Sequence, residues 1–247
     1  MLLKIINQGC KETILLNKFS PKFLASVTCL HEAQIALDAD VDIIDLKNPQ
    51  EGSLGALSLK VIQEIVALID KRKIVSTTIG DLVMDPYLIE TAVQRMSTTG
   101  VDIIKIGFFG TKNHLECIEA LKNSTNIGFK LVAVLFADQS IDFKILDVLE
   151  KAGFYGVMLD TSNKNSGNLL AHQSLEKLAE FTMRARTRNL FSGLAGSLSL
   201  ENIKLLSKTK SDYLGFRGGI CHKGDRKLSI CPNQIKEVKK MMRSFLI

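Results

Sequence analysis

The chain has 247 residues, of which 46% are hydrophobic and 23% charged, and its 32 Lys and Arg residues against 26 Asp and Glu residues leave a formal net charge of +6. This composition is too apolar for a disordered chain, and the length allows one large domain or two small ones. No apolar run approaches the ~20 residues of a membrane-spanning helix, and the first residues lack the apolar core of a secretory signal. We therefore expect a cytoplasmic protein that contacts no membrane.

The positive charge, the aromatic content and the cysteines exclude further classes of partner and site. Aromatic residues make up 6% of the chain, without Trp, and they are not interleaved with basic residues as a stacking surface for nucleic acid requires. We therefore expect no nucleic-acid partner and assign the charge to solvated helix faces and to a pocket for a small anion. The five Cys residues are an odd number without a C-x-x-C pair, which indicates neither a disulfide framework nor a zinc ribbon.

Eight short apolar runs bounded by turn signals predict eight strands. They occupy residues 23–27, 41–47, 73–80, 101–108, 129–137, 156–161, 190–197 and 213–219. Most are separated by an amphipathic stretch long enough for one helix, and eight such units in about 225 residues predict a single-domain (β/α)8 TIM barrel. A doubly wound sheet is the alternative, but no Gly-rich turn follows the first run. We expect residues 1–22 to form an N-terminal extension and residues 23–247 to form the barrel domain.

The even-numbered strands resemble one another in sequence. Residues 41–47 align with residues 101–107, and in the same frame the sixth strand reads 156–160 and the eighth 211–217. Because side chains alternate across a strand, and alternate strands of a barrel contribute to one interior layer, this alignment predicts the inward residues. One layer is expected to hold Asp45, Lys105, Asp160 and Gly215, with Lys47 and Arg217 one step nearer the C-terminal ends of the strands.

Charged side chains inside a barrel have two explanations. One is a self-neutralising ion network, because an unpaired buried charge costs several kcal/mol. Chemistry is favoured, because barrel enzymes carry their catalytic residues at these strand ends. A desolvated lysine beside a second cation is a good nucleophile toward carbonyls, so Lys47 and Lys105 are expected to be the Schiff-base nucleophile and the proton acceptor, in an order that their spacing leaves open. Asp45 and Asp160 are expected to move protons, and Lys164 to close over bound substrate.

Glycines after the last two strands predict a phosphate site, because the last two loops of such barrels commonly bind phosphate with backbone amides. The predicted ligands are Gly196, Ser197, Arg217, Gly218 and Gly219. Ser53, in the loop after the second strand, is a candidate for a second phosphate, and a plain loop is an equal explanation there. The histidines lack partners at ligand spacing, so we expect no metal, and no feature calls for a cofactor.

At these residues the sequence resembles the (5-formylfuran-3-yl)methyl phosphate synthase family, also described as 4-(hydroxymethyl)-2-furaldehyde phosphate synthases. The most specific motifs are D-x-K-N-P at residues 45–49 and E-G-S-L-G-A at residues 51–56. Further matches are residues 78–81, 104–107, 158–161, 195–197, 217–218 and 223–226, so the likeness runs over nearly the whole chain.

The resemblance implies a (β/α)8 barrel that condenses two molecules of glyceraldehyde 3-phosphate through a lysine Schiff base, without a metal. One phosphate and water are lost, and the product is a precursor of methanofuran-type one-carbon cofactors. It implies that Lys47 forms the Schiff base and that Lys105 accepts a proton, with Asp45, Asp160 and Lys164 assisting. The sequence departs from the family in its N-terminal extension, in Phe136 where an aromatic hydroxyl is usual, and in a shortened loop around Lys164.

Two other functions remain open on sequence grounds. A class I aldolase-like enzyme or an isomerase acting on another sugar phosphate would use the same lysines and release no phosphate. A non-catalytic binder of phosphometabolites or RNA would bind RNA with a strong salt dependence. The sequence also leaves a homo-oligomer open, because an exposed apolar helix face would favour association.

Overall fold

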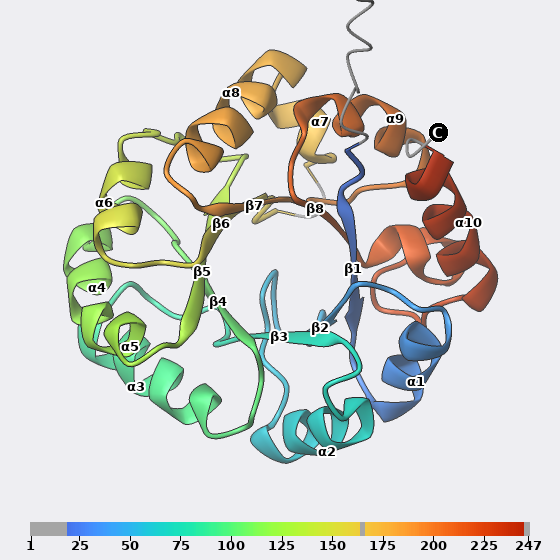
Figure 1. Ribbon diagram of the computed structural model, residues 1–247, viewed down its shortest axis with the longest axis horizontal. Coiled ribbons are helices and arrows are strands. Elements are labelled where there is room, and N and C mark those ends of the chain that lie inside the picture. Colours follow the sequence, from blue (N-terminus) through green and yellow to red (C-terminus); the bar gives the residue numbers. More distant parts are fainter. Residues whose placement is uncertain (1–18, 164–165, 245–247) are drawn as a thin grey trace, which may run out of the picture.

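Eight parallel strands form one closed barrel with the helices packed around its outside (Figure 1). The computed structural model describes residues 19–163 and 166–244. The strands are β1 (Lys22–Val27), β2 (Ile43–Leu46), β3 (Ile74–Thr78), β4 (Ile103–Gly107), β5 (Lys130–Phe136), β6 (Gly156–Asp160), β7 (Phe191–Leu194) and β8 (Tyr213–Phe216). They neighbour one another in sequence order and β8 closes on β1, so the predicted (β/α)8 barrel is confirmed.

Helices connect the strands, and several of them begin at polar capping residues. Ser58, Asp85 and Ser174 accept hydrogen bonds from backbone N–H groups in the first turns of α2, α3 and α8. The helices are α1 (Leu30–Asp38), α2 (Leu59–Ile69), α3 (Pro86–Ser97), α4 (His114–Ala120), α5 (Lys122–Asn126), α6 (Ile145–Lys151), α7 (Leu169–His172), α8 (Leu175–Arg186), α9 (Ile203–Leu206) and α10 (Pro232–Arg243), with short 3-10 helices η1 (Leu200–Asn202), η2 (Ser207–Thr209), η3 (Gly218–Ile220) and η4 (His222–Gly224). Within the described residues, no helix is both long and apolar enough to cross a membrane.

The predicted domain boundary stays a prediction. Residues 1–18 lie outside the described part of the chain, and β1 begins at Lys22, one residue before the predicted start of the barrel. The last described helix, α10, packs beside α1 and against η3, which follows β8, so the barrel occupies the chain through Arg243.

Strand register sets the height of each inward side chain. Asp45 on β2 pairs through Ser76 with Ile103 on β4. Its ion-pair partner Lys105 lies two residues beyond Ile103, as expected for the slant of strands in a closed barrel. Asp45 and Lys105 therefore share one layer, as the sequence predicted.

Asp160 lies in a different layer from the one predicted. Lys105 pairs through β5 with Gly156, so the same offset of two residues reaches Met158 on β6. Met158 is therefore the β6 member of the layer of Asp45 and Lys105. Asp160 lies two residues further, one step nearer the C-terminal ends of the strands.

The prediction was wrong here because β6 lacks the residue that marks the frame elsewhere. Asp42, Asp102 and Asp212 stand directly before β2, β4 and β8, and each carboxylate accepts the backbone N–H of the preceding strand at 2.7–2.8 Å. Tyr155 occupies the corresponding position before β6. Without an Asp there, the alignment matched Asp160 to Asp45 and shifted by two residues.

A second buried ion pair joins α1 to the end of β8. The Arg217 guanidinium donates to both oxygens of Glu32, at 2.6 Å and 3.2 Å. Thr28 donates to the same carboxylate through its backbone N–H and its hydroxyl. Burial alone raises the pKa of Glu32, but the bonds from Arg217 and Thr28 outweigh it and hold the pKa below its ordinary value of 4.5.

We predict that Arg217→Met destabilises the barrel by about 3–5 kcal/mol, because it leaves the Glu32 carboxylate buried without its counter-ion. Equilibrium unfolding in denaturant measures the change. Arg243→Met is the control, because Arg243 makes an exposed ion pair with Asp40 at 3.2 Å that contributes little. Equal losses in the two variants would contradict a structural role for the buried pair, and Glu32→Gln combined with Arg217→Met is expected to recover part of the loss.

Candidate active site

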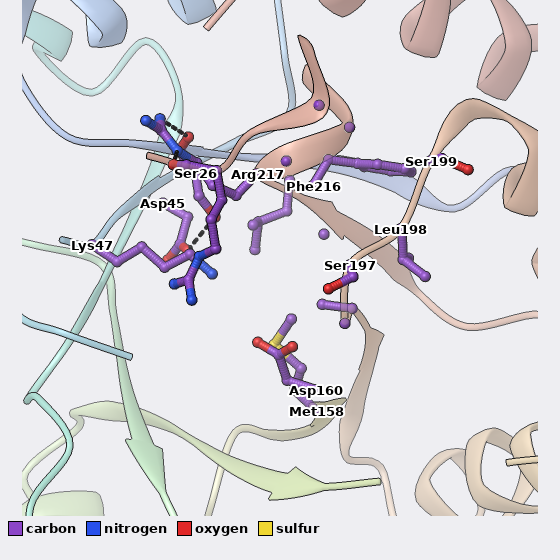
Figure 2. A pocket seen from close by; sticks show the side chains of 18 of the residues that line it. Ser26, Asp45, Lys47, Met158, Asp160, Ser197, Leu198, Ser199, Phe216 and Arg217 are labelled. Carbon is purple, nitrogen blue, oxygen red and sulfur yellow. Dashed lines mark hydrogen bonds between the residues drawn. The ribbon is translucent and has the colours of Figure 1, made fainter. Parts of the chain in front are cut away.

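A cavity of about 370 Å³ opens at the C-terminal ends of the strands. Its walls come from β1, β2, β6 and β8, from Lys47 directly after β2, and from the loops that follow β7 and β8. Figure 2 shows Asp45 and Lys47 on one side of this space and Met158 and Asp160 on another, with Ser197 on the loop after β7. Gly215 keeps the floor open, because a Cβ there would meet the Met158 methyl group at 3.1 Å.

Asp45 lies at the base of the cavity and is fully buried. Lys105 Nζ lies 2.8 Å from Asp45 Oδ1. The Ser76 hydroxyl donates to Oδ1 at 2.7 Å, and the Ser26 hydroxyl donates to Oδ2 at 2.9 Å. Burial by itself raises the pKa of Asp45, but the ammonium groups of Lys105 and Lys47 and the bond from Ser76 outweigh it, so the pKa is lowered and the carboxylate stays ionised.

The two predicted lysines occupy different places. Lys47 follows β2 directly and lines the cavity. Lys105 lies beneath it at 1% exposure, and its side chain borders a small void of about 10 Å³ inside the barrel with Ser76 and Tyr213. Both ammonium groups act on Asp45, so the structure brings the two lysines to one carboxylate, and of the two, Lys47 lines the main cavity.

Asp160 ends β6 and lines the cavity wall away from Lys47 (Figure 2). Its Oδ1 accepts the backbone N–H of Thr161 at 2.7 Å. The loop that follows is held by Asp138, whose carboxylate accepts the backbone N–H groups of Ser162 and Asn163 at 2.8 Å and 2.7 Å. Lys164, which the sequence nominates on this loop, lies outside the described residues.

The predicted glycine loops meet at the cavity rim. Gly196, Ser197, Gly218 and Gly219 all line the cavity. In the part of the chain that the structure describes, the backbone amides of these four residues have no acceptor within the protein. Gly219 is required by close approach, because a Cβ there would lie 2.3 Å from the carbonyl oxygen of Leu198. The two loops thus provide unused donors of the kind that bind phosphate.

Arg217 lines the cavity, but its guanidinium already has protein partners. Besides Glu32, it donates to the carbonyl oxygens of Ser26, Arg226 and Leu228 at 2.8–3.1 Å. These bonds use all five of its N–H groups. The expectation that Arg217 donates to a substrate phosphate is therefore corrected: its N–H groups hold the loop after β8 in place.

The predicted second phosphate position at Ser53 is also filled from within the protein. The Asp81 carboxylate, after β3, accepts the backbone N–H and hydroxyl of Ser53 and the backbone N–H of Leu54, at 2.7–3.2 Å. An internal carboxylate thus occupies the donors that the sequence offered to a substrate anion, and Ser53 does not line the cavity.

Arg226 is a cavity residue that is absent from the predicted phosphate ligands. It follows η4, lines the cavity, and donates from Nη2 to the carbonyl oxygen of Gly52 at 2.9 Å. The available signal was the K-G-D-R segment at residues 223–226, which gives no indication of which basic side chain turns inward. Among the described residues, no group of three or more His, Cys, Asp or Glu side chains is arranged to hold a metal ion.

Comparison with known proteins identifies a family for this chain. The family model described as 4-HFC-P synthase matches residues 23–239. The (5-formylfuran-3-yl)methyl phosphate synthase of Methanococcus maripaludis strain C5 is 35% identical over 236 residues, covering 91% of this chain and 98% of the relative. The protein of that name from Methanocaldococcus jannaschii is 34% identical over 232 residues, covering 89% and 99%.

Solved structures share the fold at low sequence identity. Phosphoribosyl anthranilate isomerase from Thermus thermophilus superposes with a TM-score of 0.65 at 11% identity, over 90% of this chain and 98% of that chain. 3-Hexulose-6-phosphate synthase from Salmonella typhimurium superposes with a TM-score of 0.62 at 17% identity, over 91% and 99%. These likenesses support the barrel alone. The family match and the identity to its members over almost the whole barrel show that this chain belongs to the (5-formylfuran-3-yl)methyl phosphate synthase family.

Proposed function

We propose that the protein condenses two molecules of glyceraldehyde 3-phosphate, through a Schiff base on Lys47, to (5-formylfuran-3-yl)methyl phosphate. The observation that carries this proposal is a cavity-lining lysine that shares one buried carboxylate, Asp45, with a second lysine, in a chain of this family. The atoms balance when the two triose phosphates lose one phosphate and two waters. We place the reaction in the cytoplasm, without nucleic acid as a partner.

The first step is the addition of the Lys47 amine to the aldehyde carbon of one triose phosphate. Lys47 and Lys105 both act on the Asp45 carboxylate, so each ammonium group disfavours the proton of the other. Loss of the Lys47 proton relieves this repulsion and frees the amine for attack. Water then leaves and an iminium forms, whose positive charge Asp45 balances.

The next steps break one phosphate ester and make the carbon–carbon bond. Removal of the proton on C2 beside the iminium lets the electron pair form a C2–C3 double bond while the C3–O bond breaks, and phosphate takes that bonding pair. Loss of the C2 proton of the second triose phosphate gives an enolate, and its C2 bonds to C3 of the conjugated iminium. The electron pair of the C2–C3 double bond moves to form an enamine, which takes up a proton at C2 and becomes an iminium again. Closure of the C2 oxygen onto the second aldehyde, loss of two waters and hydrolysis of the iminium give the furan and return the lysine.

Proton transfer in these steps falls to the groups around the cavity. Asp160, away from Lys47 on the cavity wall, is our candidate for removing and returning protons at carbon. The resemblance implies that Lys105 accepts a proton, but as an ammonium group paired with Asp45 it has no free lone pair for one. Our candidate role for Lys105 is therefore electrostatic: its charge beside Asp45 favours loss of the Lys47 proton. We keep Lys164 in the proposal, as a residue that closes over bound substrate, because the family resemblance implies that it assists. Gly196, Ser197, Gly218 and Gly219 are our candidates for holding phosphate.

Borohydride reduction in the presence of glyceraldehyde 3-phosphate is expected to attach the triose to Lys47, because reduction makes the Schiff base permanent. Peptide mass mapping identifies the modified residue. Lys47→Ala is expected to abolish the adduct, whereas Lys130→Ala is expected to leave it intact, since Lys130 is an exposed residue that begins β5 at the opposite end of the barrel. An adduct confined to any other lysine would overturn the assignment of the nucleophile.

Lys105→Met is expected to slow trapping at Lys47 and to raise the pH at which trapping is half-maximal. Without the second cation, Asp45 stabilises a proton on Lys47 alone, so the amine is freed only at higher pH. The rate of adduct formation as a function of pH measures this shift. An unchanged pH profile would show that Lys105 does not act on Lys47 through Asp45.

Phosphate release separates the proposed synthase from the aldolase or isomerase alternative. The synthase is expected to release one inorganic phosphate for every two glyceraldehyde 3-phosphate molecules consumed, together with a furan that absorbs in the ultraviolet. An aldolase or isomerase releases none. A phosphate assay run beside substrate consumption decides between them, and turnover without phosphate would favour the alternative.

A further inference from the structure

Two arginines, Arg217 and Arg226, line the cavity, and in the described part of the chain Arg226 is the one with N–H groups left to bind a ligand. Arg226 is half-buried and lines the cavity, and Gly52 is the acceptor that it has among the described residues. Burial lowers the pKa of Arg226 below the ordinary value of an arginine, while Asp160 and Asp81 act to raise it. An arginine so placed remains charged at neutral pH, so it brings a permanent cation with unused N–H groups to the cavity.

The second buried ion pair holds Arg226 in this place. Arg217 Nε donates to the carbonyl oxygen of Arg226, and Arg217 Nη2 donates to that of Leu228, both at 2.8 Å. Arg217 is itself fixed by Glu32. The backbone of Arg226 is therefore tied to the end of β1 and to α1, while its side chain reaches across to the loop after β2, where it meets Gly52.

Two kinds of phosphate donor thus line one cavity. Backbone amides of Gly196, Ser197, Gly218 and Gly219 lie after β7 and β8, and the Arg226 guanidinium lies against the loop that begins directly after Lys47. The proposed reaction also has two phosphates, and their fates differ. The phosphate of the triose bound to Lys47 leaves, and the phosphate of the other triose stays in the product.

We propose that Arg226 binds the phosphate that leaves, and that the glycine amides bind the phosphate that is retained. This inference rests on the proposed function. Bond cleavage at C3 moves an electron pair onto the departing phosphate, and a guanidinium paired with it in two hydrogen bonds stabilises the added charge more than the ester that precedes it. Backbone amides suit a group that only has to be held. Arg226 is in this view a catalytic residue, and Arg217 and Glu32 are positioning residues.

Arg226→Gln is expected to slow phosphate release about 100-fold, as loss of one preorganised donor to a developing charge does, while borohydride still traps the triose on Lys47. Single-turnover phosphate release and mass mapping of the adduct measure the two effects. Arg226→Lys is expected to recover part of the release rate, because it restores the charge without the planar fork. Lys227→Gln, an exposed neighbour, is the control and is expected to behave as the unaltered protein.

Calorimetry with inorganic phosphate tests the same site without turnover. The unaltered protein is expected to bind two phosphates, and the Arg226→Gln protein one. Unchanged phosphate binding together with unchanged release in Arg226→Gln would overturn the inference. If the unaltered protein forms no lysine adduct and releases no phosphate, the proposed function fails instead, and the phosphate titration of the two proteins still decides whether Arg226 binds the anion.

Discussion

The ion pair between Lys105 and Asp45 is the interaction on which the site depends. Two charges lie 2.8 Å apart inside the barrel, where each ion loses hydration worth several kcal/mol. Replacing a buried ion pair by apolar residues is often neutral or stabilising, so we interpret the pair by its effect on Lys47 in the proposed reaction. Asp45, held ionised by Lys105 and by the hydroxyls of Ser26 and Ser76, gives the cavity-lining lysine a counter-ion that is already shared.

The pair between Glu32 and Arg217 has the corresponding role at the rim. The N–H groups of Arg217 donate to Glu32 and to backbone carbonyl oxygens, and these bonds fix the loop that carries Arg226. In each pair, the buried cation is one that the sequence predicted to act on the substrate. In our interpretation Lys105 instead supports Lys47, and Arg217 supports Arg226. This division explains why four basic residues gather at one end of the barrel without leaving a buried charge unpartnered.

Much of the fold could be predicted from the sequence, because each strand of the barrel is buried on both faces and therefore appears in the sequence as a short apolar run. The layer of Asp45 and Lys105 followed from the repeat, since β2 and β4 both begin after an aspartate that marks the frame. The frame failed at β6, where Tyr155 replaces that aspartate, and Asp160 was therefore placed one step too low.

The sequence by itself determined the barrel, its eight strands and the gathering of Lys47, Lys105, Asp45 and Asp160 at one end, because these follow from spacing along the chain. Only the tertiary structure decided which donors are left for a ligand. Asp81 takes the amides of Ser53 and Leu54, and Glu32 takes the guanidinium of Arg217. Each of these acceptors lies far along the chain from its donor. An N–H group that donates to one acceptor is no longer available to a ligand. Which distant acceptor lies beside it depends on tertiary packing, and no local sequence pattern encodes that packing.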